Sequence, residues 1–328
     1  MTDMHALIVD AVDAPFRLTM IAKPVAGVGQ VLVRIRASGL NPLDGKIRAG
    51  QAAHAQQPLP AVLGMDLAGT IESVGPDAGG WCVGEDVYAL ATGIGGAQGS
   101  LADYAVVDAR LLAKKPEALT MREAAVLPLV LITAWEGLVD RAHVGVGHKV
   151  LVQGGAGGVG HVAVQLAVAF GAEVFATGSA NHRVVIEGLG ATFIDYRQQT
   201  VEEYVQQYTA GEGFDIVYDT VGAETLDASF RAVRAYHGHV VSCLGWGQHS
   251  LAPLSFRGAT YSGVFTLLPL LTGKGLEHHG QILAQAAQLI DAGKLKPIMD
   301  ERQFNLQTAN AAYDLLANGA HGRLAIEI

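Results

Sequence analysis

The sequence predicts an α/β protein in which a doubly wound parallel sheet follows a smaller β-rich region. From about residue 124, short apolar segments alternate with helical patterns, which is typical of parallel strands joined by crossover helices. Before that point, glycine and proline separate short β-type segments. The chain has 328 residues and 50% hydrophobic content, which is enough for two domains with large cores.

The individual elements follow from apolar periodicity. In the first region, strands are predicted at 31–36, 68–74, 86–90 and 104–107. In the second region, strands are predicted at 150–152, 174–177, 192–194, 216–219, 240–243 and 260–264. Helices are predicted at 200–208 and 226–233 between these strands, and at 280–292 and 307–317 before a closing strand at 323–328.

Charge and composition restrict the partners. The net charge of −9 and the pI near 5.7, with no run of Lys or Arg, predict no binding to nucleic acid or acidic membranes. The N-terminus lacks the pattern of a signal peptide, and the apolar stretch 124–135 is too short to span a bilayer. Two cysteines suit a reducing compartment, so we expect a cytoplasmic protein that binds small molecules.

A glycine motif indicates a dinucleotide site. The strand 150–152 runs into Gly155, Gly157 and Gly160, which fit G-x-G-x-x-G and open an apolar helix. We expect Gly155 to permit the tight turn, Gly157 to let a pyrophosphate approach, and Gly160 to let helix pack on strand. The helix N-terminus would offer N–H groups and a positive dipole end to the phosphates.

The next strand bears on which cofactor binds. NAD sites usually carry an acid about 20 residues past the motif, which binds the ribose 2′-hydroxyl. Gly178 stands there, followed by Ser179, His182 and Arg183. The missing carboxylate and the nearby donors favour NADP(H) over NAD(H), although ordinary loop residues would give the same pattern.

Several segments together resemble a known family over nearly the whole chain. In order, they are Asn41-Pro42-Leu43-Asp44, Gly64-Met65-Asp66-Leu67-Ala68-Gly69, Gly84-Glu85-Asp86-Val87-Tyr88, the glycine motif, Gly190-Ala191-Thr192-Phe193-Ile194-Asp195-Tyr196, Asp215-Ile216-Val217-Tyr218-Asp219-Thr220-Val221-Gly222 and Gly322-Arg323-Leu324. The chain resembles zinc-independent medium-chain dehydrogenases/reductases of the quinone oxidoreductase (zeta-crystallin-like) branch. The resemblance implies a GroES-like domain at 1–123 and 266–328, a Rossmann domain at 124–265, and an active site in the cleft between them.

The residues at the metal positions argue against zinc. Zinc-dependent relatives carry a Cys where Asn41 stands and a His where Met65 stands, and neither Asn nor Met is a usual zinc ligand. The pairs His237/His239 and His278/His279 have no carboxylate or cysteine partner at a metal-site spacing, so we expect no metal site. Without a Lewis acid, substrates that accept hydride readily are favoured, such as quinones and α,β-unsaturated carbonyls.

Asn41 and Asp44 are the candidate catalytic residues, since they occupy the family's active-site segment. Asn41 could donate its amide to the substrate carbonyl or to the nicotinamide ribose, and Asp44 could orient neighbours. Asn41-Pro42 also suits a turn, and Asp44 a helix N-cap. The tyrosines common in relatives are absent from 46–52, where Lys46 is either a solvated surface lysine, which is favoured, or a proton donor in place of water.

The resemblance implies further contacts with NADP(H). Predicted cofactor-binding positions are Thr133, Gly157, Gly158, Val159, Tyr196, Val221, Leu244, Gly245, Phe265 and Arg323. Sheet packing is the alternative role for Val221 and Phe265. The resemblance also implies a homodimer, paired along the apolar segment 260–271 at the sheet edge.

These expectations combine into an NADPH-dependent quinone or enone oxidoreductase. The alternatives are an enoyl-thioester reductase of the same fold and a non-catalytic NADPH-binding protein.

Overall fold

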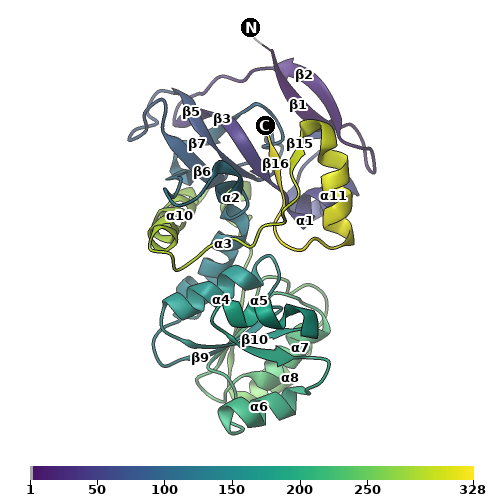
Figure 1. The fold of residues 1–328 in the computed structure, drawn as a ribbon, viewed down its shortest axis with the longest axis vertical. Coiled ribbons are helices and arrows are strands. Elements are labelled where there is room, and N and C mark those ends of the chain that lie inside the picture. Colours follow the sequence, from purple (N-terminus) through teal and green to yellow (C-terminus); the bar gives the residue numbers. More distant parts are fainter. Residues whose placement is uncertain (1–2) are drawn as a thin grey trace. The chain divides into compact units, whose positions relative to one another are not determined.

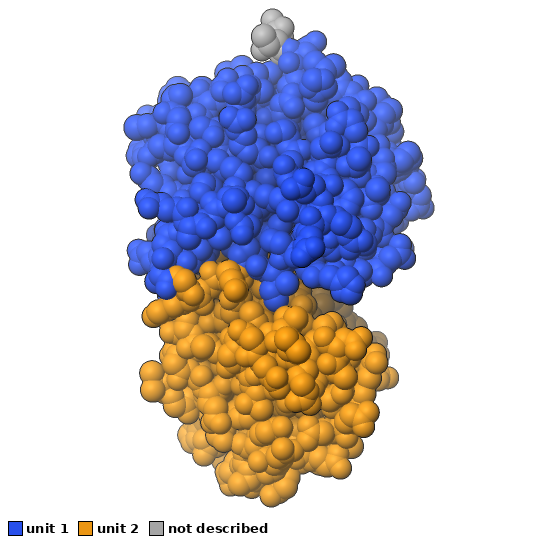
Figure 2. Space-filling view, viewed as in Figure 1, with its two compact units in different colours: residues 1–129, 267–292, 297–328 blue, residues 130–266, 293–296 orange. Residues whose placement is uncertain are grey.

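A computed structural model describes residues 3–328 and divides the chain into two compact units, which Figure 2 colours separately. Unit 1 comprises the residues up to Leu129 together with Leu267–Ala292 and Pro297–Ile328. Unit 2 comprises Val130–Thr266 and a short return of the chain at Gly293–Lys296.

Unit 2 is built on a six-stranded sheet in the order β11-β10-β9-β12-β13-β14, with every neighbouring pair parallel (Figure 1). The strands are β9 (Lys149–Gln153), β10 (Glu173–Gly178), β11 (Thr192–Asp195), β12 (Ile216–Asp219), β13 (His239–Ser242) and β14 (Thr260–Gly263). Strand order reverses between β9 and β12, which is where such sheets bind ligands. The predicted doubly wound sheet is therefore confirmed.

The helices of unit 2 cover this sheet. They are α3 (Pro128–Trp135, which begins in unit 1), α4 (Gly160–Ala169), α5 (Arg183–Gly188), α6 (Val201–Thr209), α7 (Glu224–Ala232) and α8 (Ala252–Arg257). Helix α4 contacts β9 and β10, and α7 contacts β12 and β13. Helix α6 begins at a capping box, in which Thr200 and Glu203 satisfy each other's backbone N–H groups.

Unit 1 is mainly antiparallel. A seven-stranded sheet has the order β15-β16-β3-β5-β6-β8, with β7 also paired to β3, and a smaller sheet has the order β2-β1-β4. The strands are β1 (Asp3–Val9), β2 (Arg17–Ala22), β3 (Gln30–Gly39), β4 (Ala61–Val62), β5 (Asp66–Val74), β6 (Asp86–Leu90), β7 (Tyr104–Asp108), β8 (Ala113–Lys114), β15 (Phe304–Asn305) and β16 (Ala325–Glu327). Both ends of the chain contribute to this unit, because β16, near the C-terminus, pairs with β3 from the N-terminal part of the chain.

The helices of unit 1 are α1 (Pro42–Arg48), α2 (Met121–Ala125), α9 (Leu268–Thr272), α10 (Leu276–Asp291) and α11 (Ala309–Asn318). Figure 1 shows α11 close to α1, and the two helices are in contact. Among the described residues, none of the helices combines the length and apolar character needed to cross a membrane.

The segment 260–271 departs from the prediction. Strand β14 ends at Gly263, and Leu268–Thr272 forms helix α9, with Pro269 in its first turn. Proline suits that position because its missing N–H has no helical partner there. Strand β14 does lie at the sheet edge, as predicted. The hairpin of β1 and β2 was not predicted, and none of the β2 residues is fully buried.

Candidate functional site

In unit 2, the turn between β9 and α4 has the geometry of a phosphate cradle. Gly154, not Gly155, adopts the left-handed conformation with φ of 76°, and its N–H donates to the Thr177 hydroxyl at 3.0 Å. The prediction that Gly155 permits the turn is therefore wrong. A Cβ at Gly155 would lie 2.5 Å from the Cβ of Ala176 in β10, so this glycine permits close packing of neighbouring strands.

Gly160 and Gly157 differ in how strictly their packing requires glycine. A Cβ at Gly160 would collide with the carbonyl of Gly154, so only glycine fits where α4 packs on the turn. A Cβ at Gly157 would lie 3.2 Å from the same carbonyl, so a side chain there requires that carbonyl to shift slightly. Packing therefore requires glycine less strictly at Gly157 than at Gly160, and the approach of a pyrophosphate to Gly157 stays a prediction.

The first turn of α4 offers backbone N–H donors. The helical hydrogen bonds begin with His161 N–H, which donates to the Gly157 carbonyl at 3.0 Å. The amides of Gly158, Val159 and Gly160 precede this bond, where a helix has no internal acceptors for its N–H groups. Amides and a positive dipole end at a glycine cradle fit a pyrophosphate, so the residues present fit a dinucleotide cofactor.

Beside this turn, β10 ends at Gly178. The Ser179 hydroxyl and the His182 ring lie 3.2 Å apart, and Arg183 pairs with Glu187 at 3.1 Å. The structure therefore brings the four residues predicted to favour a 2′-phosphate together at one strand end.

The neighbouring strand end adds two residues that sequence reasoning missed. Asp195 lies in register with Gly178 on the adjacent strand β11, so a carboxylate lies close to Gly178 in space although not in sequence. Its carboxylate accepts the N–H of Arg197 at 3.0 Å, and the Arg197 guanidinium lies 5.6 Å from the ring of Tyr196. Tyr196 is 54% exposed, so its hydroxyl is available to a ligand.

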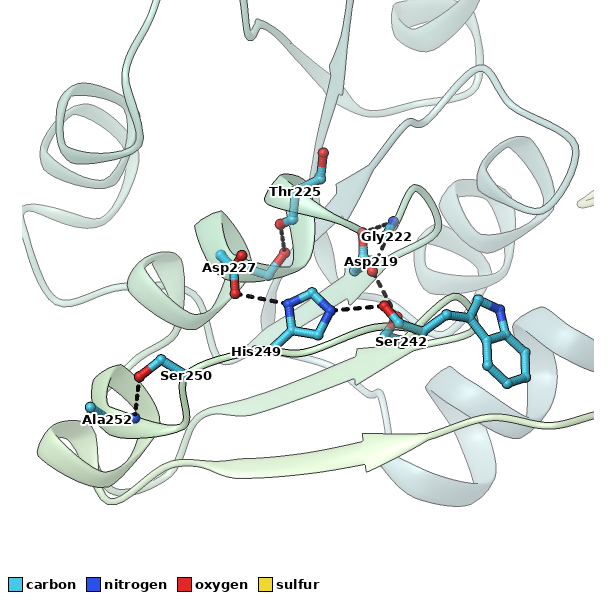
Figure 3. A network of polar contacts seen from close by, with 10 residues as sticks. Asp219, Gly222, Thr225, Asp227, Ser242, His249, Ser250 and Ala252 are labelled. Carbon is cyan, nitrogen blue, oxygen red and sulfur yellow. Dashed lines mark hydrogen bonds and ion pairs between the residues drawn. The ribbon is translucent and has the colours of Figure 1, made fainter.

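The ends of β12 and β13 are fixed by one buried carboxylate, drawn in Figure 3. Asp219 accepts the N–H groups of Val221 and Gly222 at 3.1 and 3.0 Å, and the Ser242 hydroxyl at 2.7 Å. The same hydroxyl accepts the Leu244 N–H at 3.1 Å. The predicted cofactor residues Val221 and Leu244 are thereby held at adjacent strand ends.

Three other residues of unit 2, Thr133, Gly245 and Phe265, were predicted to bind the cofactor, and each has packing or hydrogen-bond contacts within the unit. A Cβ at Gly245 would collide with the Tyr261 hydroxyl, which explains the glycine by packing. The Thr133 hydroxyl is bonded to that of Thr266 at 2.9 Å. The Phe265 ring packs edge-on against Trp246, with centroids 6.2 Å apart.

In unit 1, the two candidate catalytic residues lie at the start of α1. Asn41 is the N-cap, and its N–H donates to the Asp44 carboxylate at 3.0 Å. Asp44 is therefore the third helical residue, and its alternative reading as the N-cap is wrong. The Tyr313 hydroxyl donates to the same carboxylate at 3.0 Å.

The Asn41 side chain is the centre of a buried polar network. Its amide nitrogen donates to Asp66 at 2.8 Å, and its amide oxygen accepts from Arg323 at 2.7 Å. The guanidinium also donates to the Val126 carbonyl at 3.1 Å, and Leu129 N–H donates to Asp66 at 2.9 Å. Asn41 is 1% exposed, so its orientation is fixed by these partners.

Burial controls the charges of this network. It raises the pKa of Asp66 to about 7, with hydrogen bonding from Asn41 opposing the rise. Burial likewise raises the pKa of Asp44 to about 6, opposed by the Asn41 N–H and the Tyr313 hydroxyl. It lowers the pKa of the Arg323 guanidinium, against the attraction of Asp66 and Asp44. Arg323, predicted to contact the cofactor, is thus placed in the buried network that holds Asn41.

Within residues 3–328, no three His, Cys, Asp or Glu side chains gather as they would around a metal ion. Met65 is fully buried, next in the chain to Asp66.

Known proteins match both units. Residues 27–117 match the family described as alcohol dehydrogenase GroES-like domain, and residues 189–323 the family described as zinc-binding dehydrogenase. The 2-methylene-furan-3-one reductase of Solanum lycopersicum is 35% identical over 93% of this chain and 74% of its own length. The chloroplastic NADPH-dependent alkenal/one oxidoreductase of Arabidopsis thaliana is 33% identical with the same coverage.

More distant and structural matches agree. The quinone oxidoreductase of Homo sapiens is 27% identical over 92% of this chain and 89% of its own length. An alcohol dehydrogenase superfamily protein from Novosphingobium aromaticivorans superposes with a TM-score of 0.97 at 56% identity, covering 99% of both chains. The chain therefore belongs to the medium-chain dehydrogenase/reductase family, in its quinone oxidoreductase branch.

Proposed function

We propose that this protein is a zinc-independent, NADPH-dependent oxidoreductase that reduces a quinone or an α,β-unsaturated carbonyl compound. The observation that carries the proposal is the glycine cradle at the start of α4, combined with Asn41 and Met65 at the positions of zinc ligands. Bound NADPH supplies the hydride, and such substrates accept it without a Lewis acid. The relatives named for alkenal/one, furanone and quinone substrates support this substrate class.

The residues of this chain would position the cofactor. The amides of Gly158 and Val159 would bind the pyrophosphate, next to the cradle that Gly157 keeps open. Val221, Leu244 and Gly245 would line the groove, because Asp219 and Ser242 fix the ends of β12 and β13.

Asn41 and Asp44 act less directly in the reaction than their position in the family's active-site segment implies. The Asn41 amide nitrogen donates to Asp66, its amide oxygen accepts from Arg323, and Asp44 is fully buried. We therefore assign them to positioning the polypeptide around the active-site segment. Water is then the simplest source of the final proton.

NADP(H) is proposed over NAD(H). His182, Arg183 and Arg197 supply positive charge or donors around the end of β10, and a 2′-phosphate would gain charged hydrogen bonds there. Asp195 opposes this preference, but its carboxylate is turned to the Arg197 N–H.

A homodimer paired at β14 is proposed as the assembly, and the cytoplasm as its compartment. Among the strands of residues 3–328, β14 pairs only with β13, and an unpaired edge is a template for a second strand. Such a two-fold contact closes after two copies.

Consumption of NADPH with a panel of quinones, enones and enoyl thioesters tests the function. Turnover with quinones or enones supports the proposal, turnover with thioesters alone favours the enoyl-thioester reductase, and cofactor binding without turnover favours a non-catalytic protein.

A further inference from the structure

His249 bridges two elements of unit 2 that carry no sequence motif. It follows β13 in the loop 243–251, and Figure 3 shows its ring between helix α7 and the backbone of its own loop. One ring nitrogen, Nδ1, lies 2.9 Å from the Asp227 carboxylate. The other, Nε2, lies 3.0 Å from the Trp246 carbonyl oxygen. The His249 side chain is only 13% exposed.

The chemistry of these partners determines the state of the ring. A carboxylate and a carbonyl oxygen are both acceptors, and a neutral imidazole has only one N–H to donate. Both contacts are hydrogen bonds only when His249 is a cation. When His249 loses a proton, the remaining N–H stays on Nδ1 and donates to the Asp227 carboxylate. A lone pair on Nε2 then faces the Trp246 carbonyl oxygen, and that hydrogen bond is lost.

The surroundings favour the cation. The pKa of His249 is raised, chiefly by the hydrogen bond to Asp227 on α7 and then by the Trp246 carbonyl, and Asp219 at the end of β12 contributes in the same direction. From β14, Tyr261 packs edge-on against Phe230, with centroids 5.8 Å apart. Phe230 in turn packs edge-on against the His249 ring, with centroids 6.3 Å apart.

The bonded carbonyl belongs to the loop that the proposed function places along the cofactor. Leu244 and Gly245 precede Trp246, whose indole packs against Phe265. We propose that His249 is a positioning residue whose protonated ring fixes the loop 244–249 in the shape that binds the nicotinamide cofactor. Loss of its proton releases the Trp246 carbonyl and weakens cofactor binding.

The cofactor part of this inference rests on the proposed function, so the experiment has two readouts. The first is tryptophan fluorescence of the free protein against pH, which follows the loop without cofactor. Trp246→Phe identifies the contribution of Trp246 among the three tryptophans. The second is the affinity for NADH against pH. NADH lacks the 2′-phosphate, whose own titration near pH 6 would confuse the profile.

We expect an inflection in both profiles above the ordinary histidine pKa of about 6.5, with affinity falling roughly fivefold as pH rises through it. His249→Gln should remove the inflection. Asp227→Asn should move it to lower pH, because the negative charge is lost and the side-chain oxygen acceptor remains. His237→Gln, an exposed histidine in the same unit, is the matched control and should change neither profile.

The outcomes separate the two claims. An unchanged inflection in His249→Gln, or an unshifted one in Asp227→Asn, would overturn the role of His249. If the fluorescence inflection is normal but no cofactor binds at any pH, the contact between His249 and the loop stands and the proposed function is contradicted. Should His249→Gln fail to fold, the Asp227→Asn shift decides.

Discussion

Asn41 and Asp66, which lie 25 positions apart, are joined by a buried hydrogen bond of 2.8 Å from amide to carboxylate. Arg323 completes the arrangement from the other end of the chain. In a zinc-dependent relative, the position of Asn41 carries a metal ligand. Here Asn41 hydrogen-bonds a buried carboxylate and a buried guanidinium, which also bond to the Leu129 N–H and the Val126 carbonyl respectively.

The raised pKa of Asp44 predicts a pH effect on stability. A carboxyl whose pKa rises from 3.8 to about 6 on folding contributes stability below pH 4 that is lost as pH rises through 6. Asp44→Asn cannot ionise, so its free energy of unfolding relative to wild type should increase between these values by about 3 kcal/mol. Urea unfolding at several pH values measures this difference, with the exposed Glu117→Gln as control. A difference that is flat or falls with pH would show that Asp44 is not a buried acid of raised pKa.

The glycine cradle predicts opposite effects at two positions. Gly157→Val should fold after a small shift at the Gly154 carbonyl, 3.2 Å from its Cβ, and should abolish cofactor binding because its side chain blocks the pyrophosphate. Gly160→Ala should destabilise unit 2 by about 1–3 kcal/mol or more, because its Cβ meets the Gly154 carbonyl. Thermal unfolding and NADPH titration together distinguish them. Normal NADPH affinity in folded Gly157→Val would refute the placement of the phosphates.

Local patterns predicted most of the elements but not the contacts between them. Strands β6 and β12 match their predicted ranges, 86–90 and 216–219, because alternation and apolar runs are local signals. The pairing of Asp195 with Gly178, and the bridge from His249 to Asp227, depend on strand register and on the packing of a loop against a helix. Neither leaves a periodic signal. Asp66 lay within a recognised motif, but its burial next to Arg323 could not be inferred from that motif.

Cofactor preference should follow the charges near Gly178. NADPH should bind at least about tenfold more tightly than NADH, which corresponds to about 1.4 kcal/mol. Arg183→Gln or Arg197→Gln should reduce this ratio with little effect on NADH. Fluorescence titration with both cofactors measures the ratio, and equal affinities in the wild type would exclude a 2′-phosphate site here.

The edge of β14 predicts the assembly. We expect a homodimer of twice 34.2 kDa by light scattering. Val264 is unsuitable as a probe, although its sequence position suggests it, because it is only 8% exposed within the chain. Thr260 and Val264 N–H groups donate into the sheet at 2.9 Å, so that of Gly263 faces the open edge by alternation.

Gly263→Pro removes that outward donor without removing a bond to β13, and should shift the dimer toward monomer. A wild-type monomer would contradict the assembly, and an unaltered dimer in Gly263→Pro would mean that another surface pairs.

We propose that the protein transfers hydride from NADPH to an activated acceptor without a metal. The most direct measurement uses NADPH labelled with deuterium at the transferred position, protein dialysed against EDTA, and quinone and enone acceptors. We expect undiminished turnover after dialysis, with deuterium on the β-carbon of the reduced enone. Activity that disappears on dialysis and returns with zinc would contradict it, as would a product without deuterium.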